Sequence, residues 1–490
     1  MVAFTRSQAA DLAYEWSEPY LELNEETLRR LERNNPGVAH LRIDDSQVFE
    51  GVGRAISGNI YLFKLDIVFS SPLGENPFLD EVCRGLALNR SVQWLTLTIN
   101  VNWNCFKVDI FHMLSPFFER NHKLFVLEIK KLDVCSPQFR SLPSALKKCK
   151  NLECARFDEL RGHGEGASLI FDALQNAHKL SALYYLNSPI DNYDCMKLAS
   201  LLYRPDSQMV ELVMENNDLD EDGMAAISQA IRTSTSLMKV QCSWNECQTD
   251  EPWCYFSSIV LGTRFCDLDI VVLSGNNIGD EGVTCLGNAL AINKSVEVLD
   301  ISSNASITIA GWIAFSKCLR RSHSVLRNLD ITDCGVDEES VVTIARALRG
   351  NECLEKLTFD VDDFTVRMWT MFSDVLCDKS SIKNTYMSNH TLSDLKFSIL
   401  NEDVVLDTPL ILGKAFDVRM SLLMNVYDDK SQVARRKILK HHFPDREDNI
   451  GLFAHMPQQL LPFVMGWIGL DDLGYTLMYK LVRGLPENYN

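Results

Sequence analysis

The chain has 490 residues, of which 46% are hydrophobic, so it is too long for one ordinary core but has ample apolar material for several domains or a repeat array. Its 66 acidic and 48 basic residues give a formal net charge of −18. This charge repels the phosphates of nucleic acids and of anionic lipids, so we expect neither a nucleic-acid nor a membrane partner.

The N-terminal residues are predicted to form a cap on the structure that follows. Residues 24–38 read NEETLRRLERNNPGV, which predicts a helix that leads into a strand, and we interpret residues 1–37 as an N-terminal helical cap. The start of the chain lacks the apolar core of a signal peptide. The 15 cysteines include no CxxC pair. These features predict free thiols and a cytoplasmic location, with the nucleus as an alternative.

An internal repeat dominates the middle of the chain. Four segments share the pattern L-x-x-L-x-L-x-x-N/C followed by an apolar residue, and they start at Met209, Leu268, Val296 and Leu326. Extending this register gives further starts at Leu124, Leu152, Leu180, Leu237, Leu354 and Ile382, and weaker ones at Val38, Leu62 and Val92. Successive starts from Leu124 to Ile382 are 28 to 31 residues apart, which leaves room for a full helix after each strand.

The second half of each repeat is also periodic. After Gly223, Gly282, Gly311 and Ser340, apolar residues recur at intervals of four, seven and eight, which is one face of a helix. Such a strand and helix cannot bury their apolar sides alone, so stacked repeats must share a core. We expect Asn217, Asn245, Asn276 and Asn304, with Cys334 in the next repeat, to lie inside the turns and satisfy buried backbone groups.

The period, the Asn/Cys position and the aligned helices resemble the ribonuclease-inhibitor class of leucine-rich repeats (LRRs). The resemblance covers residues 38–392, or about 13 repeats, and is strongest from Met209 to Leu348. It implies an α/β fold: a right-handed LRR solenoid, or horseshoe, with parallel strands on the concave face and helices on the convex face. It implies little about function, because one fold hosts many functions.

The C-terminal fifth departs from the repeat. We predict a loop or linker at residues 393–410 and a helical C-terminal module, or cap, at residues 411–490. Three segments of this ending, at 388–392, 432–442 and 467–483, resemble large diatom-type algal families of ribonuclease-inhibitor-like repeat proteins. That resemblance implies a helical module without an assigned biochemical role.

No pattern predicts catalysis, a cofactor or a metal site. The glycines of RGHGEGAS, at residues 161–168, are not followed by the Lys-Ser/Thr of a phosphate-binding loop. Cysteines such as Cys285, Cys318 and Cys334 occupy core or turn positions, where a thiol is expected to act as a small hydrophobic group.

Alternation along the strands predicts which residues face outward at the fifth and seventh repeat positions. We expect an exposed apolar patch with Trp244 beside it, comprising Tyr184, Leu186, Val213, Ile270 and Val272. Glu215 adds charge near this patch, and Asp300, Asp330 and Asp360 are expected to form an acidic stripe toward the C-terminal end. Exposed apolar surface bordered by charge is typical of a binding site.

These features favour a non-catalytic, monomeric scaffold that binds a protein, in particular a basic one, on its concave face. One alternative is a ribonuclease inhibitor, which the fold and the acidity fit. Another is a GTPase-activating LRR protein of the Ran-activator type, although the N-terminal repeats show no matching residues.

Overall fold

The structure is a computed structural model, and it describes most of the chain. The described residues are 20–44, 49–70, 77–100, 109–162, 166–245, 247–263, 267–320, 325–361, 364–399, 409–426 and 429–442. Strands and helices alternate, and the strand order follows the chain order from β1 to β14. The predicted class, an α/β leucine-rich-repeat solenoid, is thereby confirmed. The chain divides into two compact units, residues 1–272 and 273–490, which we describe separately.

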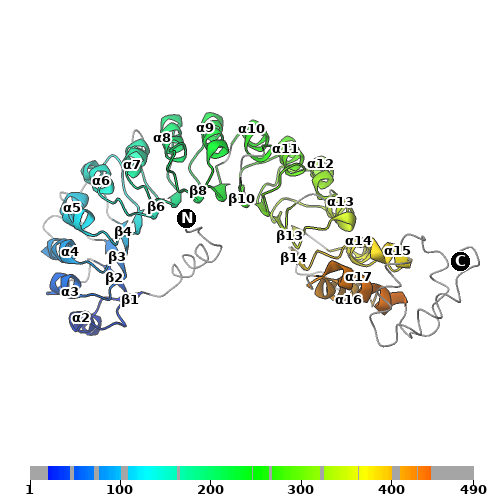
Figure 1. Cartoon of the computed structure of the whole chain (residues 1–490), viewed down its shortest axis with the longest axis horizontal. Coiled ribbons are helices and arrows are strands. Elements are labelled where there is room, and N and C mark those ends of the chain that lie inside the picture. Colours follow the sequence, from blue (N-terminus) through cyan, green and yellow to red (C-terminus); the bar gives the residue numbers. More distant parts are fainter. Residues whose placement is uncertain are drawn as a thin grey trace, which may run out of the picture. The chain divides into compact units, whose positions relative to one another are not determined.

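The described residues of the first unit form ten parallel strands. They are β1 (Leu21–Glu22), β2 (His40–Asp44), β3 (Lys64–Phe69), β4 (Trp94–Ile99), β5 (Val126–Lys130), β6 (Cys154–Asp158), β7 (Ala182–Leu186), β8 (Glu211–Glu215), β9 (Lys239–Ser243) and β10 (Ile270–Val272). The helices between them are α2 (Glu25–Glu32), α3 (Val52–Gly58), α4 (Pro77–Leu88), α5 (Ile110–Arg120), α6 (Leu142–Leu146), α7 (Gly166–Leu174), α8 (Asn192–Leu202), α9 (Glu221–Thr233) and α10 (Glu251–Phe256). In Figure 1 the strands of this unit lie along its inner, concave side and the helices along its outer side.

The second unit continues the same alternation. Its strands are β11 (Val298–Asp300), β12 (Asn328–Asp330), β13 (Lys356–Val361) and β14 (Asp394–Ile399). Its helices are α11 (Asp280–Leu290), α12 (Ile309–Leu319), α13 (Glu338–Ala347), α14 (Val366–Leu376), α15 (Ile382–Tyr386), α16 (Pro409–Asn425) and α17 (Lys430–His442). The apolar repeat positions form the core between strands and helices, as Leu299, Ile301 and Phe315 illustrate, all three fully buried.

Buried asparagines connect successive repeats, as predicted. The side chain of Asn304 accepts the backbone N–H groups of Asn276 (3.0 Å) and Ile278 (2.9 Å). It donates to the carbonyls of Leu273 (3.0 Å) and Ile301 (2.7 Å). In the first unit, Asn245 accepts the N–H of Asn217 and donates to the carbonyl of Met214, and the side chain of Asn217 donates to the carbonyl of Ser188. Cys334 donates its thiol to the Ile301 carbonyl. These contacts satisfy backbone groups that would otherwise be buried without partners.

A second set of asparagines, which we did not predict, holds the opposite turns, between helix and strand. Asn389, for example, accepts the N–H of Leu392 (2.8 Å) and donates to the carbonyl of Leu348 in the preceding repeat (2.8 Å). Each of these residues stands three positions before a repeat start, and they are Asn59, Asn89, Asn121, Asn293, Asn351 and Asn389.

Two expectations for the end of the array are wrong. The repeat predicted to start at Ile382 is not a strand, because residues 382–386 form helix α15. The last repeat starts instead at Leu392, and residues 394–399, expected to belong to a loop, form β14 paired with β13. The predicted N-terminal segment does contain a helix, α2, but it also supplies a strand, β1, which pairs with β2.

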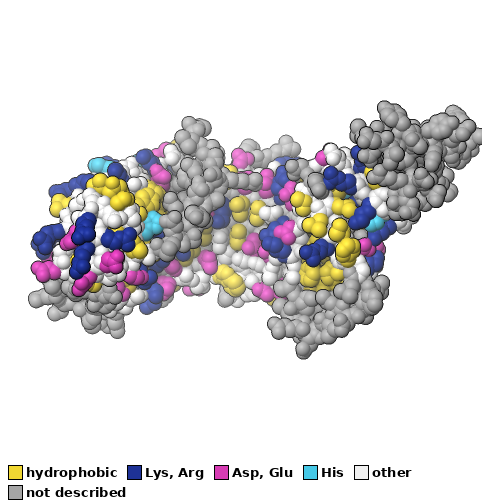
Figure 2. Space-filling model, turned by 90° about the horizontal axis from the view of Figure 1, so that it is seen from below, with side chains coloured by type: hydrophobic (Ala, Val, Ile, Leu, Met, Phe, Trp, Pro, Cys, Tyr) yellow, Lys and Arg dark blue, Asp and Glu magenta, His cyan; other side chains and the backbone are white. Residues whose placement is uncertain are grey.

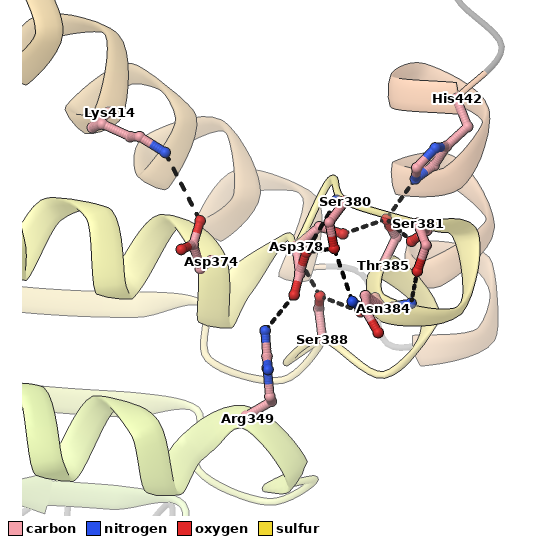
Figure 3. A network of polar contacts seen from close by, with 10 residues as sticks. All are labelled: Arg349, Asp374, Asp378, Ser380, Ser381, Asn384, Thr385, Ser388, Lys414 and His442. Atoms are coloured by element: carbon pink, nitrogen blue, oxygen red, sulfur yellow. Dashed lines mark hydrogen bonds and ion pairs between the residues drawn. The ribbon is translucent and has the colours of Figure 1, made fainter.

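Polar contacts link helices α14, α15, α16 and α17, and several of them are drawn in Figure 3. Thr385 Oγ1 lies 2.7 Å from His442 Nε2, and Lys414 of α16 pairs with Asp374 of α14 at 3.8 Å. The ammonium of Lys437 is fully buried and donates to the carbonyls of Leu376 (2.6 Å) and Asn389 (2.9 Å). Burial lowers the pKa of Lys437 to about 7. Residues 443–490, which complete the predicted C-terminal module, lie outside the described residues.

The cysteines depart in part from the expectation of free thiols. Eleven of the described cysteines are free and mostly buried, in agreement with their prediction as core residues. Cys254 and Cys285 are disulfide-bonded, so the expectation is wrong for these two. Among the helices in the described ranges, none is both long and apolar enough to cross a membrane.

We predict that Asn304→Ala lowers the free energy of unfolding by about 3 kcal/mol, because it leaves the N–H groups of Asn276 and Ile278 buried without acceptors. Chemical denaturation followed by circular dichroism measures the change. The matched control, Asn384→Ala, removes an exposed asparagine and should change stability by less than about 0.5 kcal/mol. Equal effects of the two substitutions would contradict the role given to Asn304.

Candidate functional site

The strand register brings the predicted fifth-position residues of the first unit into one row. Tyr184 of β7 pairs with Val213 of β8, Val213 pairs with Gln241 of β9, and Gln241 pairs with Val272 of β10. Ile270 lies two residues before Val272 and pairs with Lys239. The predicted residues therefore do share one face, but β9 contributes Gln241 and Lys239 between the Tyr184–Val213 pair and the residues of β10.

The expectation of one exposed apolar patch is wrong in part. Leu186 and Val213 are only 7% and 4% exposed, whereas Tyr184, Ile270 and Val272 are half-buried. Figure 2 shows both hydrophobic and charged side chains on the visible surface. Strand alternation predicts the direction of a side chain, but close neighbours on a curved sheet decide how much of it reaches solvent.

Tyr184 is held by charged residues that the sequence analysis missed. Its hydroxyl donates to Glu211 Oε2 (2.8 Å), and Lys239 Nζ pairs with Glu211 Oε1 (2.6 Å). Burial, reinforced by the Glu211 carboxylate, raises the pKa of Tyr184. Glu211 and Lys239 occupy the third repeat position, which faces outward by the same alternation, so the pattern could have identified them. Glu215, at the predicted seventh position, accepts a hydrogen bond from Gln241 (3.2 Å).

A charged network continues along the earlier strands. Glu128 of β5 pairs with Lys130 (3.0 Å) and with Arg156 of β6 (3.0 Å), and it accepts a hydrogen bond from Thr96 of β4 (3.0 Å). Burial raises the pKa of Asp66 to about 6, although Arg42 lies 3.7 Å away. The strand-bearing face of this unit is thus lined by paired charges, which suit the recognition of a polar partner surface.

Trp244 has an unusual backbone conformation and an exposed side chain. It follows β9 at the eighth repeat position, and its φ is 57°. The same position has a φ between 48° and 66° in eight repeats, at Lys131, Glu159, Asn187, Asn216, Trp244, Gly275, Ser303 and Asp333. Left-handed backbone favours glycine and asparagine and disfavours bulky side chains. The indole is nevertheless 46% exposed, whereas Trp94, Trp253 and Trp312 are buried.

The predicted acidic stripe lies in the second unit and is shorter than expected. Asp300 and Asp330 are half-buried neighbours on paired strands. Asp360 does not extend the row, because Thr358 is the residue that pairs with Asp330. The Asp360 side chain is only 5% exposed and accepts the backbone N–H of Asp333 (2.6 Å). Burial also raises the pKa of Asp360. This buried hydrogen bond gives Asp360 a structural role in the turn.

Within the residues that the structure describes, no group of three or more His, Cys, Asp and Glu side chains has the arrangement of a metal site. The arrangement on the strand-bearing face offers hydrogen-bonding groups, paired charges and an indole. These groups can bind a polypeptide surface.

Comparisons with known proteins agree with this geometry. The leucine-rich-repeat family model matches residues 267–287. Mouse ribonuclease inhibitor is 24% identical over 255 residues, which cover 52% of this chain and 55% of that protein. Mouse NACHT, LRR and PYD domains-containing protein 4C is 26% identical, with 39% of this chain and 19% of that protein covered. Human NACHT, LRR and PYD domains-containing protein 5 is 24% identical, with coverage of 52% and 23%.

The chain has the leucine-rich-repeat fold and is similar to ribonuclease inhibitor and related leucine-rich-repeat proteins. The match covers about half, 55%, of the length of mouse ribonuclease inhibitor. It covers a smaller part of the NACHT-containing relatives. LRR proteins of this kind are typically non-catalytic and bind other proteins.

We predict that Trp244→Asn raises the free energy of unfolding by about 0.5 kcal/mol, because asparagine tolerates the left-handed backbone better than tryptophan does. Denaturant titration measures this change. The control Tyr255→Asn replaces an exposed aromatic residue within helix α10 and should give no gain. A loss of more than about 1 kcal/mol in Trp244→Asn would instead assign the indole a role in stability.

Proposed function

We propose that the protein is a non-catalytic scaffold that holds a protein partner on the strand-bearing face of its first unit. The observation that carries this proposal is Trp244, which is exposed and occupies a position where its backbone conformation is unfavourable. Tryptophan is strongly enriched among the residues that dominate binding energy. Eight repeats share the left-handed backbone at this position, and among these eight residues Trp244 alone has an aromatic side chain.

The neighbouring strands supply the rest of the proposed surface. Tyr184, Ile270 and Val272 contribute half-buried apolar area, and Glu215 and Gln241 contribute hydrogen-bonding groups. A partner that docks here meets fixed side chains, because Tyr184 is already bound to Glu211 and costs little entropy to immobilise. The paired charges of β5 and β6 would then select the orientation of the partner.

Asp300 and Asp330 support the proposal that a basic protein surface binds to the second unit. Both are half-buried, and Asp330 already accepts hydrogen bonds from the backbone and hydroxyl groups of Thr332 (3.0 and 2.6 Å). An oriented carboxylate is well suited to a lysine or an arginine. Asp360 is left out of this proposed surface because it is buried.

Affinity capture with the full chain, followed by mass spectrometry, tests the proposal. We expect Trp244→Ala and Tyr184→Ala to lose captured proteins that the parent retains, since each removes aromatic contact area from the surface. Asp330→Lys should lose only basic partners. Tyr193→Ala removes an exposed aromatic residue from helix α8 and serves as the matched control. A set of captured proteins unchanged by the three surface substitutions would sink the proposal.

Ribonuclease inhibition is the second candidate function, and the likeness to mouse ribonuclease inhibitor together with the net charge of −18 favours it. If it is correct, the protein inhibits a basic pancreatic-type ribonuclease at micromolar concentration, and Asp330→Lys weakens this inhibition. A ribonuclease assay with increasing amounts of the protein measures both effects. Full ribonuclease activity throughout the titration excludes this candidate. The GTPase-activating role stays a prediction.

A further inference from the structure

A basic cavity lies away from the strand-bearing face, at the turns that follow α5 and α6. Its volume is about 410 Å3, and its lining includes His122, Lys147, Lys148 and Lys150, together with Glu119. This size falls within the range of small-ligand sites, roughly 300 to 1,000 Å3. Nothing in the proposed protein-binding function uses this cavity.

Direct contacts join the two turns and hold the cavity open. The side-chain amide of Asn151 donates to the carbonyl of His122 (3.0 Å). Lys148 Nζ reaches back to helix α5, where it donates to Ser115 Oγ (2.5 Å) and Glu119 Oε1 (2.6 Å). The cavity is therefore formed before any ligand arrives, which reduces the entropy that binding would cost.

The charge of the lining is opposite to that of the chain. Three lysines and one glutamate give the lining a net charge of +2, whereas the whole chain carries −18. Glu119 is already bound to Lys148, whose hydrogen bond lowers the pKa of Glu119. Lys147 and Lys150 are exposed, and neither forms an ion pair with a residue that the structure describes. Two cations thus remain available at the mouth of the cavity.

Helix stabilisation alone is a weak explanation for these lysines. Cations do favour the C-terminal end of a helix. However, α6 has only five residues, so its dipole is small, and Lys148 is directed to the side chains of α5 instead. Lys150 lies beyond the end of the helix.

We propose that this cavity binds a phosphate-bearing small molecule. Lysine ammonium groups are compact charges that suit phosphate oxygens, and the two remaining lysines in the lining of one cavity favour a multivalent anion over a single carboxylate. His122 and the amide of Asn151 line the same cavity and offer further polar contacts. An acidic protein segment is the competing ligand, but a cavity of about 410 Å3 fits a compact anion better than an extended chain.

Calorimetric titration of the full chain with inorganic pyrophosphate, at about 50 mM salt, tests the proposal. We expect saturable binding at one site, weakened by added salt. The double variant Lys147→Glu, Lys150→Glu should bind at least about tenfold more weakly, because it replaces attraction by repulsion at the mouth. Lys317→Glu reverses the charge of an exposed lysine on helix α12 and should keep the affinity of the parent.

Three outcomes would overturn the proposal. The first is no binding of pyrophosphate by the parent at millimolar concentration. The second is equal binding by the parent and the double variant, with circular dichroism showing that both are folded. The third is binding of a glutamate polymer that pyrophosphate cannot displace, which would assign the cavity to an acidic protein segment. None of these results depends on the proposed protein-binding face.

Discussion

Backbone groups that turn inward between repeats must find hydrogen-bond partners, and this requirement governs the structure. In a solenoid the turns lie against one another, so water cannot reach their N–H and carbonyl groups. Asn304 meets the requirement with one amide that both donates to and accepts from neighbouring turns. Asn389 does so at the opposite turn. Because each amide spans two repeats, the spacing of the asparagines keeps successive strands level.

The same turns determine what the candidate binding face can be. The residue just before the buried asparagine adopts a left-handed backbone in repeat after repeat, so most repeats tolerate only certain side chains there at low cost. Trp244 occupies this position at the end of β9, beside strands that carry paired charges. The face is therefore a polar surface with one prominent indole, and the solenoid itself provides the rigidity that such a surface needs for recognition.

Much of this arrangement could be predicted from the pattern of residues, and the errors are informative. The predicted repeat starts from Met209 to Leu354 agree with the strands of the structure, because each start has the apolar spacing that the core requires. The start at Ile382 failed because a step of 28 residues was assumed where helix α15 is inserted. The asparagine that stands three residues before six of the starts, Val296 and Leu354 among them, would have corrected it, since Asn389 stands three residues before Leu392. Likewise, Leu186 and Asp360 face the predicted way but are covered by their neighbours.

The sequence by itself determined the repeat class, the direction of the strand side chains and the identity of the buried residues in the turns after the strands. These follow from local periodicity, because a strand alternates every two residues and a helix turns every 3.6. Only the tertiary structure decided which outward-facing side chains reach solvent, that Glu211 holds Tyr184, and that the turns after α5 and α6 line a basic cavity. Those properties depend on side chains some 30 residues apart in the chain, whose proximity exists only once the repeats have stacked.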